Sequence, residues 1–73
     1  MPQSRPMSTI GPRCHELRIR DPNHTWRIIY RTDPDAIVIA EVFDKKTGMT
    51  PIRIIEACRR RLQQYDEAKE GRS

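Results

Sequence analysis

Two short segments of the chain alternate between apolar residues and arginine. In residues 17–20 (LRIR) and 26–31 (WRIIYR), side chains point alternately to opposite faces of a strand. One face collects Leu17, Ile19, Trp26, Ile28 and Tyr30, and the other collects Arg18, Arg20, Arg27 and Arg31. The pattern predicts two neighbouring strands, near residues 14–20 and 25–32, with one apolar and one cationic face.

Residues 21–24 (DPNH) are turn formers and predict a hairpin between these strands. A hairpin with Arg20 opposite Thr25 sets Arg18 directly across from Arg27. Like charges in such a pair destabilise a sheet by roughly 0.2–1 kcal/mol. The arginine face therefore favours contact with a polyanion over a role in the fold.

A third strand and one helix follow. Residues 33–35 (DPD) turn the chain into a strand at 36–43 (AIVIAEVF), which is apolar on both faces except at Glu41 and so predicts cover on both sides. The helix is predicted to start near Thr50 as N-cap, with Pro51 at its first position. Its apolar stripe, at spacings of three and four, consists of Ile55, Cys58, Leu62 and Tyr65.

These elements predict an α+β fold, a three-stranded antiparallel meander followed by one C-terminal helix. We divide the chain into an extended leader or linker (1–13), the domain itself (14–67) and a flexible tail (68–73). One helix covers only one sheet face, so we infer a missing layer, supplied by a lost N-terminal segment, a second copy in a homo-oligomer or a binding partner. Trp26 and Tyr30, opposite the arginines, are expected to pack in the core.

Composition narrows the function classes. The chain has 73 residues and a formal net charge of +4, and most of its 14 basic residues are arginine, whose planar fork suits phosphate. The spacing of Cys14 and Cys58 fits no zinc motif and there is no signal peptide, so both are expected to be cytosolic thiols. No apolar run is long enough to span a bilayer, which excludes a membrane-spanning protein.

Three segments together resemble one known family. HELRIR (15–20), TWRIIYR (25–31) and EVFDKKTGMTP (41–51), leading into a basic helix, resemble the C-terminal two-thirds of the RelE/ParE toxin superfamily, most closely its phage-derived HigB-type branch. Residues 43–51 fit the Phe-x-Lys-Lys-Thr-x-x-Thr-Pro motif at every defined place. The resemblance covers about residues 15–65. Family members carry a strand and a helical hairpin upstream, so the resemblance implies a RelE-like fold that is truncated at its N-terminus.

The resemblance implies the toxin of a type II toxin–antitoxin system, a ribosome-dependent endoribonuclease (mRNA interferase, a hydrolase) that acts in the cytoplasm without metal or cofactor. Its partners would be mRNA on the ribosome and a cognate antitoxin, often a helix-turn-helix protein. Arg27 resembles the family's phosphate-stabilising arginine. The basic pair on the first strand corresponds to Arg18 and Arg20, and the pair after the third strand to Lys45 and Lys46. Many relatives have His where this chain has Glu41, so a catalytic role of that histidine cannot be assigned to this position.

A metal-free ribonuclease uses the RNA 2′-hydroxyl as nucleophile and needs a proton acceptor, an acid and cations around the developing charge. Arg27 and Arg18 are the best charge stabilisers. Arginine hardly acts as a base, so we assign proton transfer to Lys45 or Lys46. Further candidates for RNA binding are Arg20, Arg31, Arg59, Arg60, Arg61 and Tyr65.

Simpler interpretations remain open. The arginine face can be a solvated surface with salt bridges to Glu16, Asp21 and Asp44, and the helix arginines an ordinary solvated helix face. Glu41 can act as a general base or merely neutralise Arg27. Both histidines lack metal-ligand companions and are expected to be exposed or simply packed. Two other functions compete with the nuclease: a non-catalytic module that binds nucleic acid or an antitoxin, and a ParE-type gyrase inhibitor.

Overall fold

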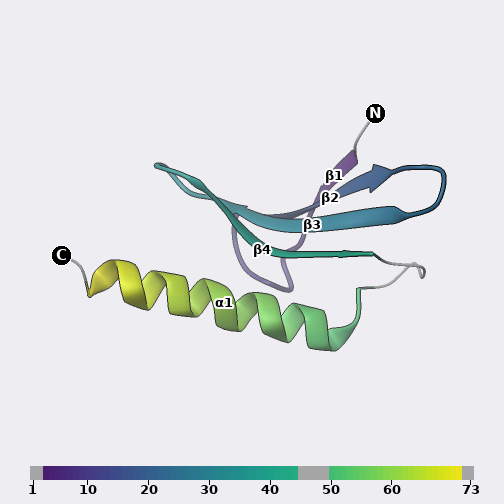
Figure 1. Cartoon of the computed structure of the whole chain (residues 1–73). Helices are drawn as coiled ribbons and strands as arrows, with labels where there is room; N and C mark the ends of the chain where they lie inside the picture. The colour runs from purple at the N-terminus through teal and green to yellow at the C-terminus, as the bar shows by residue number, and fades with distance from the viewer. Residues whose placement is uncertain (1–2, 45–49, 72–73) are drawn as a thin grey trace.

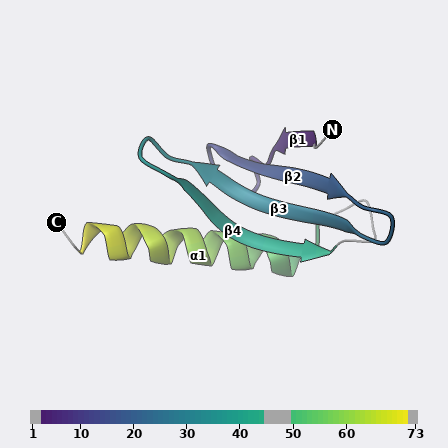
Figure 2. The same ribbon diagram turned by 45° about the horizontal axis from the view of Figure 1, so that its top comes forward.

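The structure is a computed structural model that describes residues 3–44 and 50–71. Four strands come first, β1 (Gln3–Pro6), β2 (Cys14–Arg20), β3 (Thr25–Thr32) and β4 (Ile37–Asp44), and the helix α1 (Ile52–Glu70) follows. The strands form one antiparallel sheet in the order β1-β2-β3-β4, and α1 lies along one face of it (Figure 1, Figure 2). The predicted α+β class, an antiparallel meander followed by a C-terminal helix, is confirmed.

The β2–β3 hairpin has the predicted register. Arg20 pairs with Thr25, and Arg18 pairs with Arg27. The turn is held by Asp21, whose Oδ1 accepts hydrogen bonds from the backbone N–H groups of Asn23 (2.8 Å) and His24 (2.7 Å). A carboxylate that satisfies its own turn in this way explains why DPNH reverses the chain.

The number of strands was predicted wrongly, because the segment assigned to the leader contains a fourth strand. Residues 3–6 form β1 and pair with β2, from Gln3 opposite Arg18 to Pro6 opposite His15. The loop that follows buries Met7 and Ile10, which are 8% and 7% exposed. Alternation did not reveal β1, because an edge strand of four residues is held mainly by backbone hydrogen bonds to its neighbour.

β4 runs from Ile37 to Asp44, one position later than predicted, and its pairing with β3 contains an irregularity. Ile29 pairs with Glu41, whereas Tyr30 pairs with Ile39, so the residue between them has no partner of its own. That residue, Ala40, is 4% exposed and belongs to the core. A bulge of this kind bends the strand and changes the alternation of side chains along it.

The helix starts differently from the prediction. Its N-cap is Pro51 and no side chain caps it, so the assignment of Thr50 as N-cap is wrong. The Thr50 hydroxyl donates a 2.9 Å hydrogen bond to Glu16 Oε2, and the negative charge of this buried carboxylate strengthens the bond. α1 also continues through residues 68–70, which we had assigned to the tail. Near its end, Lys69 Nζ lies 2.8 Å from Asp35 Oδ2.

The core lies between α1 and the arginine face of the sheet. Two predicted stripe residues of the helix, Cys58 and Leu62, are buried at 0% and 6% exposure, and the apolar residues that line the core are Met7, Ile10, Cys14, Ile29 and Ala40. The expected core position of Trp26 is therefore wrong, since it is 37% exposed on the opposite face. Both cysteines are unbridged thiols, as predicted.

Candidate functional site: a guanidinium cluster around Glu16

Three neighbouring strands bring arginines to one place on the helix-facing side of the sheet. Arg5 of β1 pairs with Glu16 of β2, and Arg18 of β2 pairs with Arg27 of β3. Cross-strand partners lie on the same face, so the period of two carries all four side chains to one side. We call these four residues the guanidinium cluster.

Glu16 is the centre of the cluster and is almost fully buried, with 1% of its surface exposed. Arg27 Nη1 donates a 2.7 Å hydrogen bond to Glu16 Oε1, and Arg5 Nη2 lies 3.3 Å from the same oxygen. Glu16 Oε2 accepts from the Thr50 hydroxyl just before α1. This carboxylate offsets the repulsion between Arg18 and Arg27, which the register places directly opposite each other.

The cluster still carries more positive than negative charge. Arg18 lines a small cavity of about 90 Å³ together with Ser4, Arg5 and Glu16. The buried Nε of Arg18 and that of Arg27 find no hydrogen-bond partner among the described residues. Three guanidinium groups around one carboxylate leave two positive charges in a partly desolvated site, which is an environment that attracts an anion.

The predicted site residue Arg27 is less accessible than the sequence suggested. It is only 4% exposed, and its closest ion pair is with Glu16. Glu41, which the sequence offered as a partner or general base beside Arg27, instead pairs with Arg61 Nη1 at 2.9 Å. Sequence reasoning named Glu16 only as a salt-bridge partner, and it missed Arg5 because β1 was not predicted.

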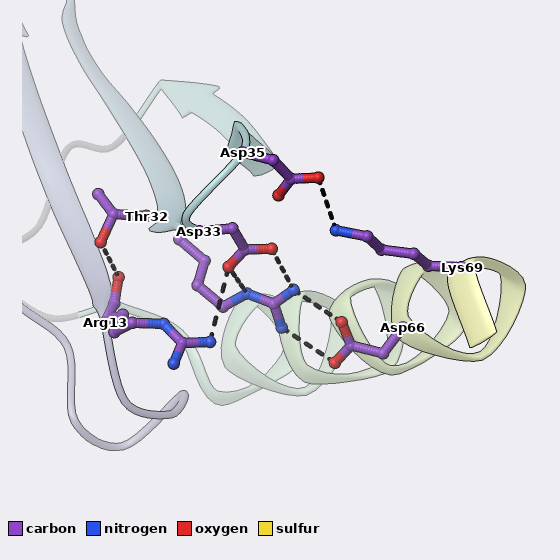
Figure 3. Close-up of polar contacts among 7 residues, drawn as sticks. Arg13, Thr32, Asp33, Asp35, Asp66 and Lys69 are labelled. Carbon is purple, nitrogen blue, oxygen red and sulfur yellow. Dashed lines mark hydrogen bonds and ion pairs between the residues drawn. The ribbon is translucent and has the colours of Figure 1, made fainter. Parts of the chain in front are cut away.

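Arg31 belongs to a second network at the other end of the sheet. All three of its guanidinium nitrogens donate to carboxylates: Nε to Asp33 at 2.7 Å, Nη1 to Asp66 at 3.0 Å, and Nη2 to both at 2.9 and 2.7 Å. Figure 3 shows how this network joins the β3–β4 turn to α1, with Arg13 and the Asp35–Lys69 pair beside it. Hydrogen bonds with Asp66 and then Asp33 raise the pKa of Arg31, and those with Arg31 lower the pKa of both carboxyls.

The remaining predicted RNA-binding residues are dispersed. Arg20 is exposed at the end of β2, and Arg59 and Arg60 are exposed on α1. Arg61 donates to the Ala40 carbonyl oxygen at 2.9 Å besides pairing with Glu41. The half-buried Tyr65 ring lies 6.0 Å from the Arg31 guanidinium carbon. The structure therefore gathers Arg18 and Arg27 with Glu16 but separates the helix arginines and Arg31 from them.

Lys45 and Lys46, to which we assigned proton transfer, lie outside the described residues. Each histidine has a local contact: His24 Nδ1 lies 2.6 Å from Asp44 Oδ2, and the His15 ring stacks on Tyr30 with centroids 5.5 Å apart. Across 3–44 and 50–71, no three His, Cys, Asp or Glu side chains are grouped so as to hold a metal ion. Nor does this part of the chain contain a helix long and apolar enough to cross a membrane.

Comparison with known proteins gives one match. A family model described as phage derived protein Gp49-like (DUF891) matches residues 1–63, which include all four strands and the whole guanidinium cluster. No curated protein and no solved structure matches the chain. Because the match spans most of the 73 residues, this chain belongs to the Gp49-like family of phage-derived proteins.

Proposed function

We propose that this protein is the toxin of a type II toxin–antitoxin pair and that it cleaves mRNA on the ribosome, with the guanidinium cluster as its phosphate site. The Gp49-like family is associated with RelE-type, toxin-like proteins. The observation that carries the proposal is the cavity lined by Arg5, Glu16 and Arg18, where positive charge exceeds negative charge and the Nε of Arg18 has no partner in the described part of the chain. The Nε of Arg27, on the neighbouring strand, also has none there. An RNA phosphodiester supplies the acceptor oxygens that such groups lack.

The proposed reaction needs no metal. The 2′-oxygen of the ribose attacks the adjacent phosphorus, a P–O bond forms to it, and the bond to the 5′-oxygen of the next nucleotide breaks. The products are a 2′,3′-cyclic phosphate and a 5′-hydroxyl. Arg18 binds the phosphate oxygens as their charge grows, Arg27 supports them from behind while Glu16 holds its orientation, and Lys45 or Lys46 moves the protons.

One observation favours a second function. Arg27 is 4% exposed and paired to Glu16, so within the guanidinium cluster it is Arg18 and the half-exposed Arg5 that present charge to a large ligand, with the exposed Arg20 farther along β2. A site of this kind can bind RNA or an acidic segment of an antitoxin without catalysing cleavage. The alternative is thus a non-catalytic binding module that uses the same cluster.

The test maps mRNA 5′ ends on ribosomes after expression of the full chain with and without its antitoxin. We compare the unmodified chain with Arg18→Ala, the Lys45→Ala/Lys46→Ala double variant and the charge-matched control Lys69→Ala, whose lysine lies near the far end of α1. Codon-phased cuts should vanish in the first two variants and persist in the control. Undiminished cutting by Arg18→Ala contradicts the assignment of the site.

Binding distinguishes the second function. If the unmodified chain cuts nothing but binds RNA with an affinity that falls steeply with salt, and Arg18→Ala weakens this binding, the protein is a binding module. Absence of both cutting and binding contradicts the proposed site in either form.

A further inference from the structure

Within residues 3–44 and 50–71, no helix or strand covers the face of the sheet opposite α1, which we call the open face (Figure 1, Figure 2). The cross-strand pairs of apolar and aromatic residues on it include Ile19 with Trp26, Leu17 with Ile28, Ile28 with Val42, and Tyr30 with Ile39. Five large side chains on this face are 37–66% exposed: Ile19, Trp26, Ile37, Ile39 and Val42. Exposed apolar patches of a few hundred Å² on soluble proteins often coincide with interaction sites, which makes this face a candidate for one.

The charge distribution indicates what covers it. Every arginine in the described strands lies on the other face, as the pairs Arg5–Glu16, Arg18–Arg27 and Cys14–Arg31 show. On the open face the only acidic or basic side chain of the four strands, histidine aside, is Asp44, at the end of β4, where it contacts His24. The centre of this face therefore has no charge that selects an acidic or a basic partner, and two copies can meet there although each carries +4 overall.

The area also suits a second copy. At roughly 80 Å² of exposed apolar surface for each of the five side chains, one protomer offers about 400 Å² and two offer about 800 Å². Leu17, Ile28 and Tyr30, half-buried between them, and the polar rim bring the total near the ~1,000 Å² of a specific interface. Faces rich in β-branched residues can pack on each other about a two-fold axis, as two sheets do in a sandwich.

We propose that two copies of this chain pack their open sheet faces together as a symmetric dimer. The result is a sandwich with the two sheets inside, the two α1 helices outside and both guanidinium clusters facing away from the interface. The inference does not depend on RNA cleavage, because the cluster and the open face lie on opposite sides of the sheet.

Sedimentation equilibrium and the emission of the single tryptophan, Trp26, test the dimer together over a wide range of protein concentration. We expect a monomer–dimer equilibrium in which Trp26 emission shifts to shorter wavelength as dimer forms. Ile39→Lys, at a 58% exposed position of β4 on this face, should raise the dimer dissociation constant by about 100-fold or more, because symmetry buries two lysines at once. Ile52→Lys makes the same substitution at a 73% exposed isoleucine of α1 and should leave the constant unchanged.

Each other outcome overturns the dimer as proposed. A monomer at every concentration, with circular dichroism showing that the chain is folded, assigns the face to a different protein. A dimer whose Trp26 emission does not shift, or which Ile39→Lys leaves intact, pairs through another surface such as the edge of β4. Equal loss of association in Ile39→Lys and Ile52→Lys contradicts the choice of face. Arg18→Ala should dimerise like the unmodified chain, so the failure of either proposal leaves the other standing.

Discussion

Removing the Arg27 side-chain charge should strongly destabilise the fold. Arg27→Met leaves the 1% exposed Glu16 carboxylate without the guanidinium that now donates to it at 2.7 Å. Breaking a buried ion pair costs about 3–5 kcal/mol. Arg5 at 3.3 Å and the Thr50 hydroxyl at 2.9 Å still contact the carboxylate, so we expect the lower end, about 3 kcal/mol.

This loss is large for a chain of 73 residues. At 0.05–0.15 kcal/mol per residue, its free energy of unfolding is about 4–11 kcal/mol. A loss of about 3 kcal/mol corresponds to a fall in Tm of about 12–24 °C for a domain of this size. The variant should therefore be partly unfolded at temperatures where the unmodified chain is folded.

Removing both charges should restore most of the stability. In the Glu16→Leu/Arg27→Met double variant neither member of the buried ion pair is left without the other, and the desolvation of these two ions no longer opposes folding. The control Arg5→Met breaks the contact of a side chain that is half exposed and should cost less than about 1 kcal/mol. Urea unfolding followed by far-UV circular dichroism, at one fixed protein concentration, measures all four proteins. A double variant no more stable than Arg27→Met would refute the reasoning.

Three further predictions concern the other end of the fold and the core. The hydrogen bond with Arg31 lowers the pKa of Asp66 below its ordinary 3.8, so the ionised carboxylate stabilises the fold above that pH, and this stabilisation is lost as pH falls through the folded-state pKa. In Asp66→Asn the free energy of unfolding should therefore fall less steeply as the pH is lowered. Burial raises the pKa of the Cys58 thiol to about 11, so iodoacetamide at pH 8 should alkylate it only on unfolding, as mass spectrometry will show; rapid native alkylation contradicts this. In urea unfolding, Leu62→Ala should lower the free energy of unfolding by about 2–5 kcal/mol, whereas Ile52→Ala, at an exposed position, should change it by no more than about 0.5 kcal/mol. Equal losses in the two variants would contradict the placement of Leu62 in the core.

Side-chain alternation was enough to predict the central hairpin. It placed Arg18 opposite Arg27, and the turn residues around Asp21 fixed the register that the structure has. The helix stripe was equally informative, because Cys58 and Leu62 are spaced so that both reach the core. These features depend on neighbours in sequence or on one hairpin, so a local pattern determines them.

The same pattern did not predict which face of the sheet α1 packs against. Alternation states which residues share a face, but Ile29, Ala40 and Cys14 make the arginine face apolar enough to receive α1 as well. The carboxylates that make this possible are Glu16 of the neighbouring strand, which neutralises Arg27, and Asp66 of α1, which neutralises Arg31. Such ion pairs between separate elements are invisible to periodicity. A rule that buries apolar faces and exposes charged ones therefore placed Trp26 in the core.

The two arginine networks divide the molecule into a closed and an open end. At the end with the β3–β4 turn, Arg31 has every guanidinium nitrogen bonded to a carboxylate, and Lys69 ties the last turn of α1 to Asp35 (Figure 3). At the other end of the sheet, where β2 also ends, β4 stops at Asp44 and α1 begins at Ile52 (Figure 1). There Arg20 is exposed and Arg18 keeps an unpartnered Nε among the described residues. Saturated guanidinium groups fasten elements together, whereas unsaturated ones in a partly buried cavity require an external acceptor. This difference, rather than the number of arginines, is why we place the proposed phosphate site near the end of β2 and not beside Arg31.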